Sequence, residues 1–391
     1  MRLLFFTVFI DLIGFGIIIP IIPFLAPEFG ASNMDIALII AVYSVCSGLL
    51  GGAWGSLSDR VGRKPVLIGC LLLTSLSYVM LAFAQTLLMV YIARIVAGCA
   101  AGIYGVAAAT VADLTDDENR AKNMGVIGAA FGLGMVFGPF LGGVLAGDEL
   151  NFVLPASVAA VLSLSAAIFC FVLMPESLPK ELRKTKRSAD NSDTKKLWPL
   201  LGEIQSRWLI SLYVLHSIVI SVTSYLFPLW TAWMLGWGPK EIGIVFGVQG
   251  LMMAALQGKL VGVLVAKFGE LSLLSFGVTL LTLGFSVATQ ADAVPLVIIS
   301  FFCIISGATI CSPVLNSILS KRVPAQYRGK VMGTSSAMGS WGRVIGPLIA
   351  GVVLTQSGYV IAWGVGIIIG VIFILWPLKE MLKAKEQQVE A

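Results

Sequence analysis

The sequence contains few charged residues and only one histidine, His216. Of its 391 residues, 12% are charged and 58% are hydrophobic, whereas about a quarter of the residues in a soluble domain are charged. It has no H-E-x-x-H and no G-x-S-x-G segment, so it lacks two common hydrolase signatures. Its six cysteines show no C-x-x-C spacing, which argues against a metal or redox centre. The composition excludes an ordinary soluble domain and predicts neither an enzyme nor a cofactor.

What the sequence does contain is a series of long apolar runs. Each is close to the roughly 20 residues that an α-helix needs to cross a hydrocarbon core. We therefore predict an all-α polytopic membrane protein that lies in the lipid bilayer with twelve transmembrane helices. The predicted spans are 3–25, 33–54, 66–84, 87–110, 123–146, 152–174, 207–235, 240–264, 270–290, 293–317, 331–356 and 358–378.

The basic residues predict the orientation of these spans. Nearly all of the 26 lysines and arginines fall on one side of the predicted topology, and Lys240 is the only one on the other side. Because basic loops stay in the cytoplasm, both termini are predicted to be cytoplasmic. The net charge of +5 then reflects membrane topology, and it does not predict nucleic-acid binding.

A polar stretch at 175–206 divides the spans six and six. We predict an N-terminal six-helix bundle at 1–174, a cytoplasmic linker at 175–206, and a C-terminal six-helix bundle with a short tail at 207–391. The basic cluster in the linker is either a solvated segment or a contact for anionic lipid. We expect a monomer.

The two halves are related in sequence. The segment at 120–125 resembles the segment at 328–333, and the glycines that follow keep the same spacing in both halves. Because each half has six spans, the two copies have the same orientation in the membrane. Parallel repeats of this kind form secondary transporters, which bind substrate near the midplane and operate by alternating access.

The loop after the second span, "GSLSDRVGRKPVL" at 55–67, resembles the loop motif of the major facilitator superfamily. Glycines there permit a tight turn and close packing, and an acid can accept hydrogen bonds from amides at a helix N-terminus. The resemblance implies the major facilitator fold, with a cytoplasmic latch between its two halves. The latch residues would be Gly55, Asp59, Arg60, Gly62, Arg63, Lys64 and Asp113.

The fifth span, "GLGMVFGPFLGG" at 132–143, resembles the signature of the drug:proton antiporters in that superfamily. Its small residues should let neighbouring helices approach closely, and its proline should kink or loosen the helix. The matching positions are Gly134, Gly138, Pro139, Gly142 and Gly143.

The first span, "FIDLIGFGIIIPIIP" at 9–23, resembles that of tetracycline efflux pumps. A lone carboxylate inside the membrane is costly and is therefore a functional candidate, and burial favours its protonated form. Asp11 is predicted to carry the coupled proton; the alternative is a structural hydrogen bond near the cytoplasmic mouth.

Arg94 in the fourth span matches an arginine that the family associates with proton coupling. Its neighbours at helical spacing are small, namely Gly98, Ala101 and Gly105, so the side chain should face protein rather than lipid. The alternative is a structural charge that binds backbone carbonyls.

Spans 7 and 8 supply candidates for substrate binding. Gln249, Gln257, Met253 and His216 are polar or polarisable groups that suit a cavity, although a lone histidine is more often a hydrogen-bonded core residue. Aromatic and Met side chains nearby would suit flat apolar compounds, or they face lipid and neighbouring helices. They are Met252, Phe227, Trp230 and Trp233. Tetracycline pumps carry a histidine and an acid where this chain has Met253 and Leu281, so the resemblance does not imply tetracycline itself.

Arg343 stands near the middle of the eleventh span, ~18 Å from its start. Its neighbours at helical spacing are Ser336, Gly339, Gly346 and Ala350, whereas Trp341, Ile345, Leu348 and Val352 form the opposite apolar stripe. Arg343 should face protein or a water-filled cavity. Its partner would be an anionic substrate, Asp11, or a backbone carbonyl.

These features together predict a proton-coupled antiporter that exports a small amphipathic molecule or drug. One alternative is an exporter of an endogenous anionic metabolite, such as a siderophore, that uses Arg343. An uptake symporter is the other, and the fifth-span motif argues against it.

Overall fold

The structure is a computed structural model that describes residues 1–148, 150–181, 183, 204–323 and 328–390, and all regular structure in these ranges is helical. Most of the predicted linker lies outside the described residues. The helices are α1 (Arg2–Ile18), α2 (Ile22–Glu28), α3 (Asn33–Val61), α4 (Arg63–Ala82), α5 (Leu87–Ala100), α6 (Ile103–Leu114), α7 (Asp117–Ala146), α8 (Val153–Leu173), α11 (Ile204–Leu235), α12 (Pro239–Ala255), the π-helical turn η1 (Leu256–Leu260), α13 (Val261–Phe268), α14 (Glu270–Ala288), α15 (Val294–Arg322) and α16 (Arg328–Glu390).

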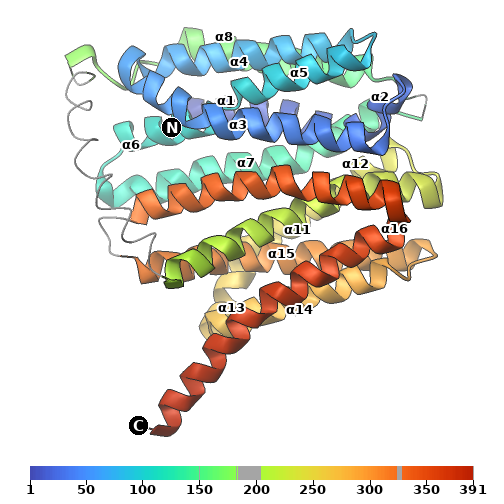
Figure 1. Ribbon diagram of the computed structural model, residues 1–391. Helices are drawn as coiled ribbons and strands as arrows, with labels where there is room; N and C mark the ends of the chain where they lie inside the picture. The colour runs from blue at the N-terminus through green and yellow to red at the C-terminus, as the bar shows by residue number, and fades with distance from the viewer. Residues whose placement is uncertain (149, 182, 184–203, 324–327, 391) are drawn as a thin grey trace. The chain divides into compact units, whose positions relative to one another are not determined.

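The number of helices that can cross a membrane agrees with the sequence prediction. In the described part of the chain, ten helical segments are long and apolar enough, or eleven when the bent pair α1 and α2 counts as one span. Helix α16 has 63 residues but departs from helical geometry at Gly358 (φ 77°, ψ −179°). Figure 1 shows that its ribbon reverses direction. Its two parts correspond to the last two predicted spans and complete the predicted twelve.

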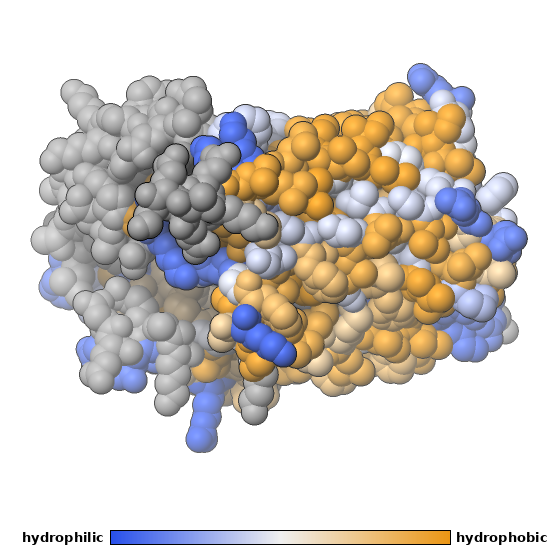
Figure 2. All heavy atoms as spheres, turned by 90° about the horizontal axis from the view of Figure 1, so that it is seen from below, coloured by the Kyte–Doolittle hydropathy of each residue, from blue (hydrophilic) through white to orange (hydrophobic). Residues whose placement is uncertain are grey.

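Much of the described surface is apolar, as expected for a protein surrounded by lipid. On α8, for example, Val161, Phe171 and Val172 are each at least 64% exposed. Figure 2 shows one face of the molecule, where hydrophobic side chains form a broad continuous area. A soluble monomer rarely exposes so large an apolar area, so these side chains are assigned to contact with lipid tails.

The chain forms two compact units with the same pattern of helix packing. The first contains Met1–Asp193 and Trp237–Gly250, and the second contains Thr194–Gly236 and Leu251–Ala391. In the first, α1 packs on α7 and α4 packs on α5 and α8; in the second, α11 and α14 each pack on α15 and α16. The contacts of spans 1, 3, 4, 5 and 6 thus recur in spans 7, 9, 10, 11 and 12, as the sequence repeat predicts.

Two local breaks in the helices have identifiable causes. Helix α1 ends two residues before Pro20, and α2 starts at an angle of 48° to it, because a proline disfavours helix in the residue before it. Between α5 and α6, a side chain on Gly102 would collide with the Trp54 ring at 2.5 Å. The Trp54 indole Nε1 also donates to the carbonyl of Cys99 at 2.6 Å, so it satisfies a carbonyl beside the break.

Equivalent glycines make the turns after spans 2 and 8. Gly62 (φ 117°) and Gly269 (φ 80°) occupy matching positions in the repeat, and each immediately precedes a helix. Side chains rarely adopt such φ values, so glycine is the residue that fits there. The tight turn expected at Gly62 is present.

Candidate functional site

Asp11 lies inside the first unit. Helix α1 holds the residue, its exposed fraction is only 6%, and the hydroxyl of Ser163 on α8 donates to its Oδ1 at 3.2 Å. This carboxyl group lies in an apolar helix bundle with a hydroxyl against it. A carboxyl group in such surroundings is costly and is therefore a candidate for function.

Arg94 is buried in the same unit, as its small neighbours predict. It is 8% exposed, and its guanidinium lies 4.4 Å from the centre of the Tyr43 ring on α3. Gly98 allows this approach, because a Cβ atom there would lie 2.6 Å from the carbonyl oxygen of Tyr43. Among the described residues, Nε of Arg94 has no hydrogen-bond acceptor.

The loop motif forms a compact ionic network around Arg63. Its guanidinium contacts Asp59 at 2.7 Å and Asp113 at 2.8 Å, and it donates to the Ser58 hydroxyl at 2.6 Å. The Arg63 side chain is only 3% exposed. The three residues that the family resemblance implied therefore meet within the first unit, and they join the ends of α3, α4 and α6.

Glu176 is a member of this network that the sequence prediction missed. Its carboxylate accepts hydrogen bonds from the backbone amides of Arg63 (2.9 Å) and Lys64 (3.3 Å). We expected Asp59 to accept hydrogen bonds from backbone amides at a helix N-terminus. At the N-terminus of α4, Glu176 accepts them instead. The only sequence signal was an acid directly after the last apolar residues of span 6. A side chain on Gly62 would collide with this carboxylate.

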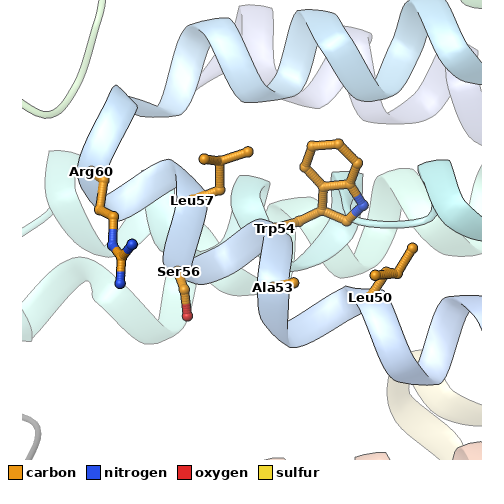
Figure 3. Close-up of a pocket in the computed structure, with 6 residues that line it drawn as sticks. All are labelled: Leu50, Ala53, Trp54, Ser56, Leu57 and Arg60. Carbon is orange, nitrogen blue, oxygen red and sulfur yellow. The ribbon is translucent and has the colours of Figure 1, made fainter.

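The remaining loop residues lie outside the network. A Cβ atom on Gly55 would meet no described atom within 4 Å, so the close packing expected there stays a prediction. Arg60 is exposed, and Figure 3 shows it at one end of a hollow along α3. The hollow, of about 400 Å³, is lined by Leu50, Ala53, Trp54, Ser56, Leu57 and Arg60. Nζ of Lys64 lies 5.7 Å from the ring centre of Phe171.

The second unit carries the equivalent ion pair with its charges exchanged. Glu270, which follows Gly269 as Arg63 follows Gly62, contacts Lys321 at 2.7 Å. Lys321 in turn occupies the repeat position of Asp113. An acid at a helix N-terminus and a base at a C-terminus complement the helix dipole. The first unit has the opposite, less favourable arrangement, which explains why Arg63 is surrounded by carboxylates.

Glycines of α7 bring it into backbone contact with α1. A Cβ atom on Gly138 would lie 2.6 Å from Cα of Gly16, and one on Gly142 would collide with the carbonyl of Ile17. A Cβ atom on Gly134 would collide with Cβ of Leu12, and one on Gly16 would lie 2.8 Å from Cδ of Pro139. Helix α7 continues through Pro139 without a break.

Gly143 faces a different helix. A Cβ atom on it would lie 2.8 Å from Cα of Gly243 on α12. Beyond this contact, Nζ of Lys240 lies 3.0 Å from Asp148. The antiporter motif thus serves two close helix contacts, α7 with α1 and α7 with α12, as its small residues predict.

We expect Gly138→Ala to destabilise the first unit strongly. The added methyl group would press on the Gly16 backbone, which cannot move aside as a side chain can, and overpacking of this kind costs about 1–3 kcal/mol. Gly132→Ala on the same helix is the matched control, because a Cβ there meets no described atom within 4 Å. Thermal unfolding of the purified protein in detergent measures both. Equal unfolding temperatures would contradict the tight α1–α7 contact.

Two aromatic residues proposed for a substrate cavity are core residues. Phe227 is 0% exposed and stacks on Phe301 with ring centres 4.0 Å apart. Trp230 is 3% exposed and meets Trp363 edge-on at 5.2 Å. The cavity prediction was wrong for both, because they pack between helices of the second unit. Trp233 is exposed.

The polar candidates of spans 7 and 8 are placed differently from one another. Nε2 of His216 lies 2.8 Å from the carbonyl oxygen of Ala308 on α15, and the ring is buried, so His216 is a hydrogen-bonded core residue. Gln249 and Met253 are half-buried, and Gln257 is exposed in η1. Their role in substrate binding stays a prediction.

Arg343 is exposed, so it is not packed inside the second unit. Its Nη2 donates to the Ser340 hydroxyl at 2.8 Å. The apolar stripe predicted on the other side of the helix is present, with Trp341 49% exposed and Val352 41% exposed. The side chain of Ser336 lies outside the described residues.

Comparison with known proteins assigns the chain to a family. The sequence model described as "Major Facilitator Superfamily" matches residues 4–333 and, separately, residues 209–390. The chain belongs to the Major Facilitator Superfamily. It is therefore a membrane transporter rather than an enzyme.

Its relatives in the superfamily include drug-resistance proteins. The tetracycline resistance protein of class C from Escherichia coli is 31% identical over 371 residues, which cover 92% of this chain and 91% of the relative. The class B protein from Escherichia coli is 30% identical and covers 97% and 95%. The quinolone resistance protein NorA from Staphylococcus aureus (strain MRSA252) is 26% identical and covers 99% and 98%.

Solved structures share the superfamily fold. A D-xylose-proton symporter has a TM-score of 0.78 at 19% identity, covering 96% of both chains. The human organic anion transporter TETRAN has a TM-score of 0.71 at 23% identity, covering 96% of this chain and 98% of the other.

Proposed function

We propose that this protein is a proton-coupled antiporter of the bacterial inner membrane, with both termini in the cytoplasm, that exports a small amphipathic compound by alternating access. The observation that carries the proposal is Asp11, a carboxyl group buried inside a transmembrane unit. A group of this kind can take up a proton in one state of the transporter and release it in the other.

The proposed direction of transport and the proposed substrate class rest on the related proteins and on the glycine signature of α7. The tetracycline and quinolone resistance proteins match the chain over almost its whole length, and α7 carries the glycine signature through which it contacts α1 and α12. Both observations favour export of a drug-like compound.

In this mechanism the proton and the substrate stabilise different states. A ligand shifts an equilibrium only by its difference in affinity between two conformations. Protonated Asp11 would favour the state that opens inward, and substrate bound in place of the proton would favour the state that opens outward. Arg94, buried in the same unit, is the second charged group that we assign to proton coupling.

Transport into inverted membrane vesicles tests this proposal. Tetracycline and a fluorescent quinolone serve as probes, and the vesicle lumen is made acidic. We expect a probe to accumulate and to leave when a protonophore collapses the gradient. Uptake into whole cells that is driven by inward proton flow would instead establish a symporter and refute the export proposal.

An anionic metabolite is a second candidate substrate, and the observation that favours it is Arg343. An exposed guanidinium in the middle of a span suits a carboxylate or a similar anion. Arg343→Ala should then weaken transport of an anionic compound about tenfold or more, since hydrogen bonds to charged groups contribute about 1.5–3 kcal/mol. Arg343→Lys, which keeps the charge, is the control. If the alanine variant loses cation transport and keeps anion transport, the anionic candidate is wrong.

A further inference from the structure

Tyr213 and Asn316 form a hydrogen-bonded pair within the second unit. The Tyr213 hydroxyl on α11 donates to Oδ1 of Asn316 on α15. A Cβ atom on Gly339 of α16 would lie 3.9 Å from Cδ1 of the Tyr213 ring. Tyr213 is close to the start of α11, and Asn316 is close to the end of α15. The pair therefore joins α11 to α15 beside α16, toward the predicted cytoplasmic side of the membrane.

The amide of Asn316 has hydrogen-bonding capacity to spare. An asparagine side chain has an acceptor oxygen and an NH2 group with two donors. Tyr213 uses the oxygen, and within the described part of the chain Nδ2 of Asn316 has no acceptor. Asn316 is half-buried, and Nδ2 is not among the buried atoms that lack a partner. Its two donors are therefore held in place by Tyr213 and are open to a ligand.

The sequence repeat shows that helix packing does not require an amide at this position. Asn316 precedes Lys321 by the same number of residues as Ala108 precedes Asp113, the repeat equivalent of Lys321. Ala108 is also half-buried. The first unit therefore has a methyl group where the second has an amide, although both positions are accessible to a similar degree. A polar group that packing does not need is a candidate for function.

The accessible side of α15 around Asn316 is polar. Between Ser306 and Ser320, every half-buried residue of α15 is a serine, a proline or an asparagine. The exposed side chains of α8 that we assign to lipid contact are apolar, for example Val161 and Phe171. Polar side chains in membrane helices almost always face the bundle interior or a water-filled cavity. This side of α15 is therefore assigned to water and substrate rather than to lipid.

We propose that Asn316 is a substrate-binding residue that donates a hydrogen bond to a carbonyl oxygen of the transported compound, and that Tyr213 is the positioning residue for its amide. The Tyr213 hydroxyl fixes the orientation of the amide, and the half-buried ring of Tyr213 adds a flat apolar surface beside it. A flat aromatic compound with a carbonyl group on its ring fits both features. The inference rests on the proposed export function and specifies its substrate class.

Equilibrium binding to the purified full-length protein tests the inference. The anisotropy of a fluorescent quinolone, which has a ring ketone, is followed as protein is added, and ethidium, a flat cation without a carbonyl group, is the comparison. Asn316→Ala should weaken quinolone binding about three- to tenfold, because one hydrogen bond is lost. The Kd of ethidium should not change. The variant should fold, since alanine already occupies the repeat position, and its unfolding temperature should stay close to wild type.

Matched controls separate substrate binding from packing. Ser320→Ala removes a hydroxyl one turn from Asn316 that donates to a carbonyl of its own helix, and it should bind the quinolone as wild type does. Tyr213→Phe keeps the ring and should weaken quinolone binding about two- to threefold, whereas Tyr91→Phe, in the first unit, should have no effect. The inference is overturned if Asn316→Ala binds the quinolone as tightly as Ser320→Ala, or if it loses quinolone and ethidium equally.

Transport of the quinolone by the purified variants in liposomes distinguishes this inference from the proposed function. Asn316→Ala and Tyr213→Phe should raise KM by the same factor as Kd and leave kcat within about twofold of wild type, because they remove binding and not coupling. A lower kcat with a wild-type KM would overturn the inference. Quinolone binding that depends on Asn316, in a wild-type protein without gradient-driven transport, would support the pair and refute the proposed function.

Discussion

Replacing Asp11 by asparagine should abolish transport driven by a pH gradient while the protein stays folded. The amide has almost the same shape and can still bond to Ser163, which lies 3.2 Å from Oδ1. It cannot take up or release a proton, so no gradient can bias its states. Removing a charge from a position that is 6% exposed should not lower the unfolding temperature, because burial of an ionised carboxylate is unfavourable.

Asp148→Asn is the matched control for this prediction. Asp148 also lies in the first unit, but its side chain is 75% exposed and pairs with Lys240. The purified variant in liposomes should transport tetracycline and the fluorescent quinolone at close to the wild-type rate when a pH gradient is applied. Retention of gradient-driven transport by Asp11→Asn would show that another group carries the proton.

Replacing Arg63 by leucine should produce the largest loss of stability among the charged residues of the first unit. Its guanidinium, 3% exposed, holds Asp113, whose side chain is 9% exposed. Without the cation, the buried carboxylate loses its ion pair with Arg63, and breaking such a pair costs about 3–5 kcal/mol. Asp59 should add little to this loss, since its side chain is 43% exposed.

Thermal unfolding in detergent measures the Arg63 effect. Arg60→Leu is the control, because Arg60 lies on the neighbouring turn and is exposed; its unfolding temperature should stay close to wild type. The double variant with Arg63→Leu and Asp113→Asn should recover part of the loss, since it also removes the negative charge that Arg63 balances. Equal effects of Arg60→Leu and Arg63→Leu would contradict the network as the source of stability.

The partners of the charged residues show where sequence-based prediction reaches its limit. Arg94 was expected to face protein because its helical neighbours are small, and its burial confirms that. Its contact with Tyr43 was not predicted, since hydropathy carries no information about which distant helix is adjacent. Glu176 was missed for the same reason: it meets Arg63 across 113 residues of chain.

The substrate candidates show a second limit. Phe227 and Trp230 have the side chains expected of a cavity for flat apolar compounds, yet both are buried between helices. A buried aromatic residue has the same local pattern whether it lines a cavity or fills a core. Only the packing of α11 against α15 and α16 separates the two cases.

The sequence by itself determined the helical membrane architecture, the internal repeat and the positions of the intramembrane charges. These properties are local: the thickness of the hydrocarbon core sets the length of each apolar run, and the repeat is visible in residue spacing. The tertiary structure decided what those charges contact. Asp11 and Ser163 are 152 residues apart in the chain, so their hydrogen bond exists only because the helices of the first unit pack together.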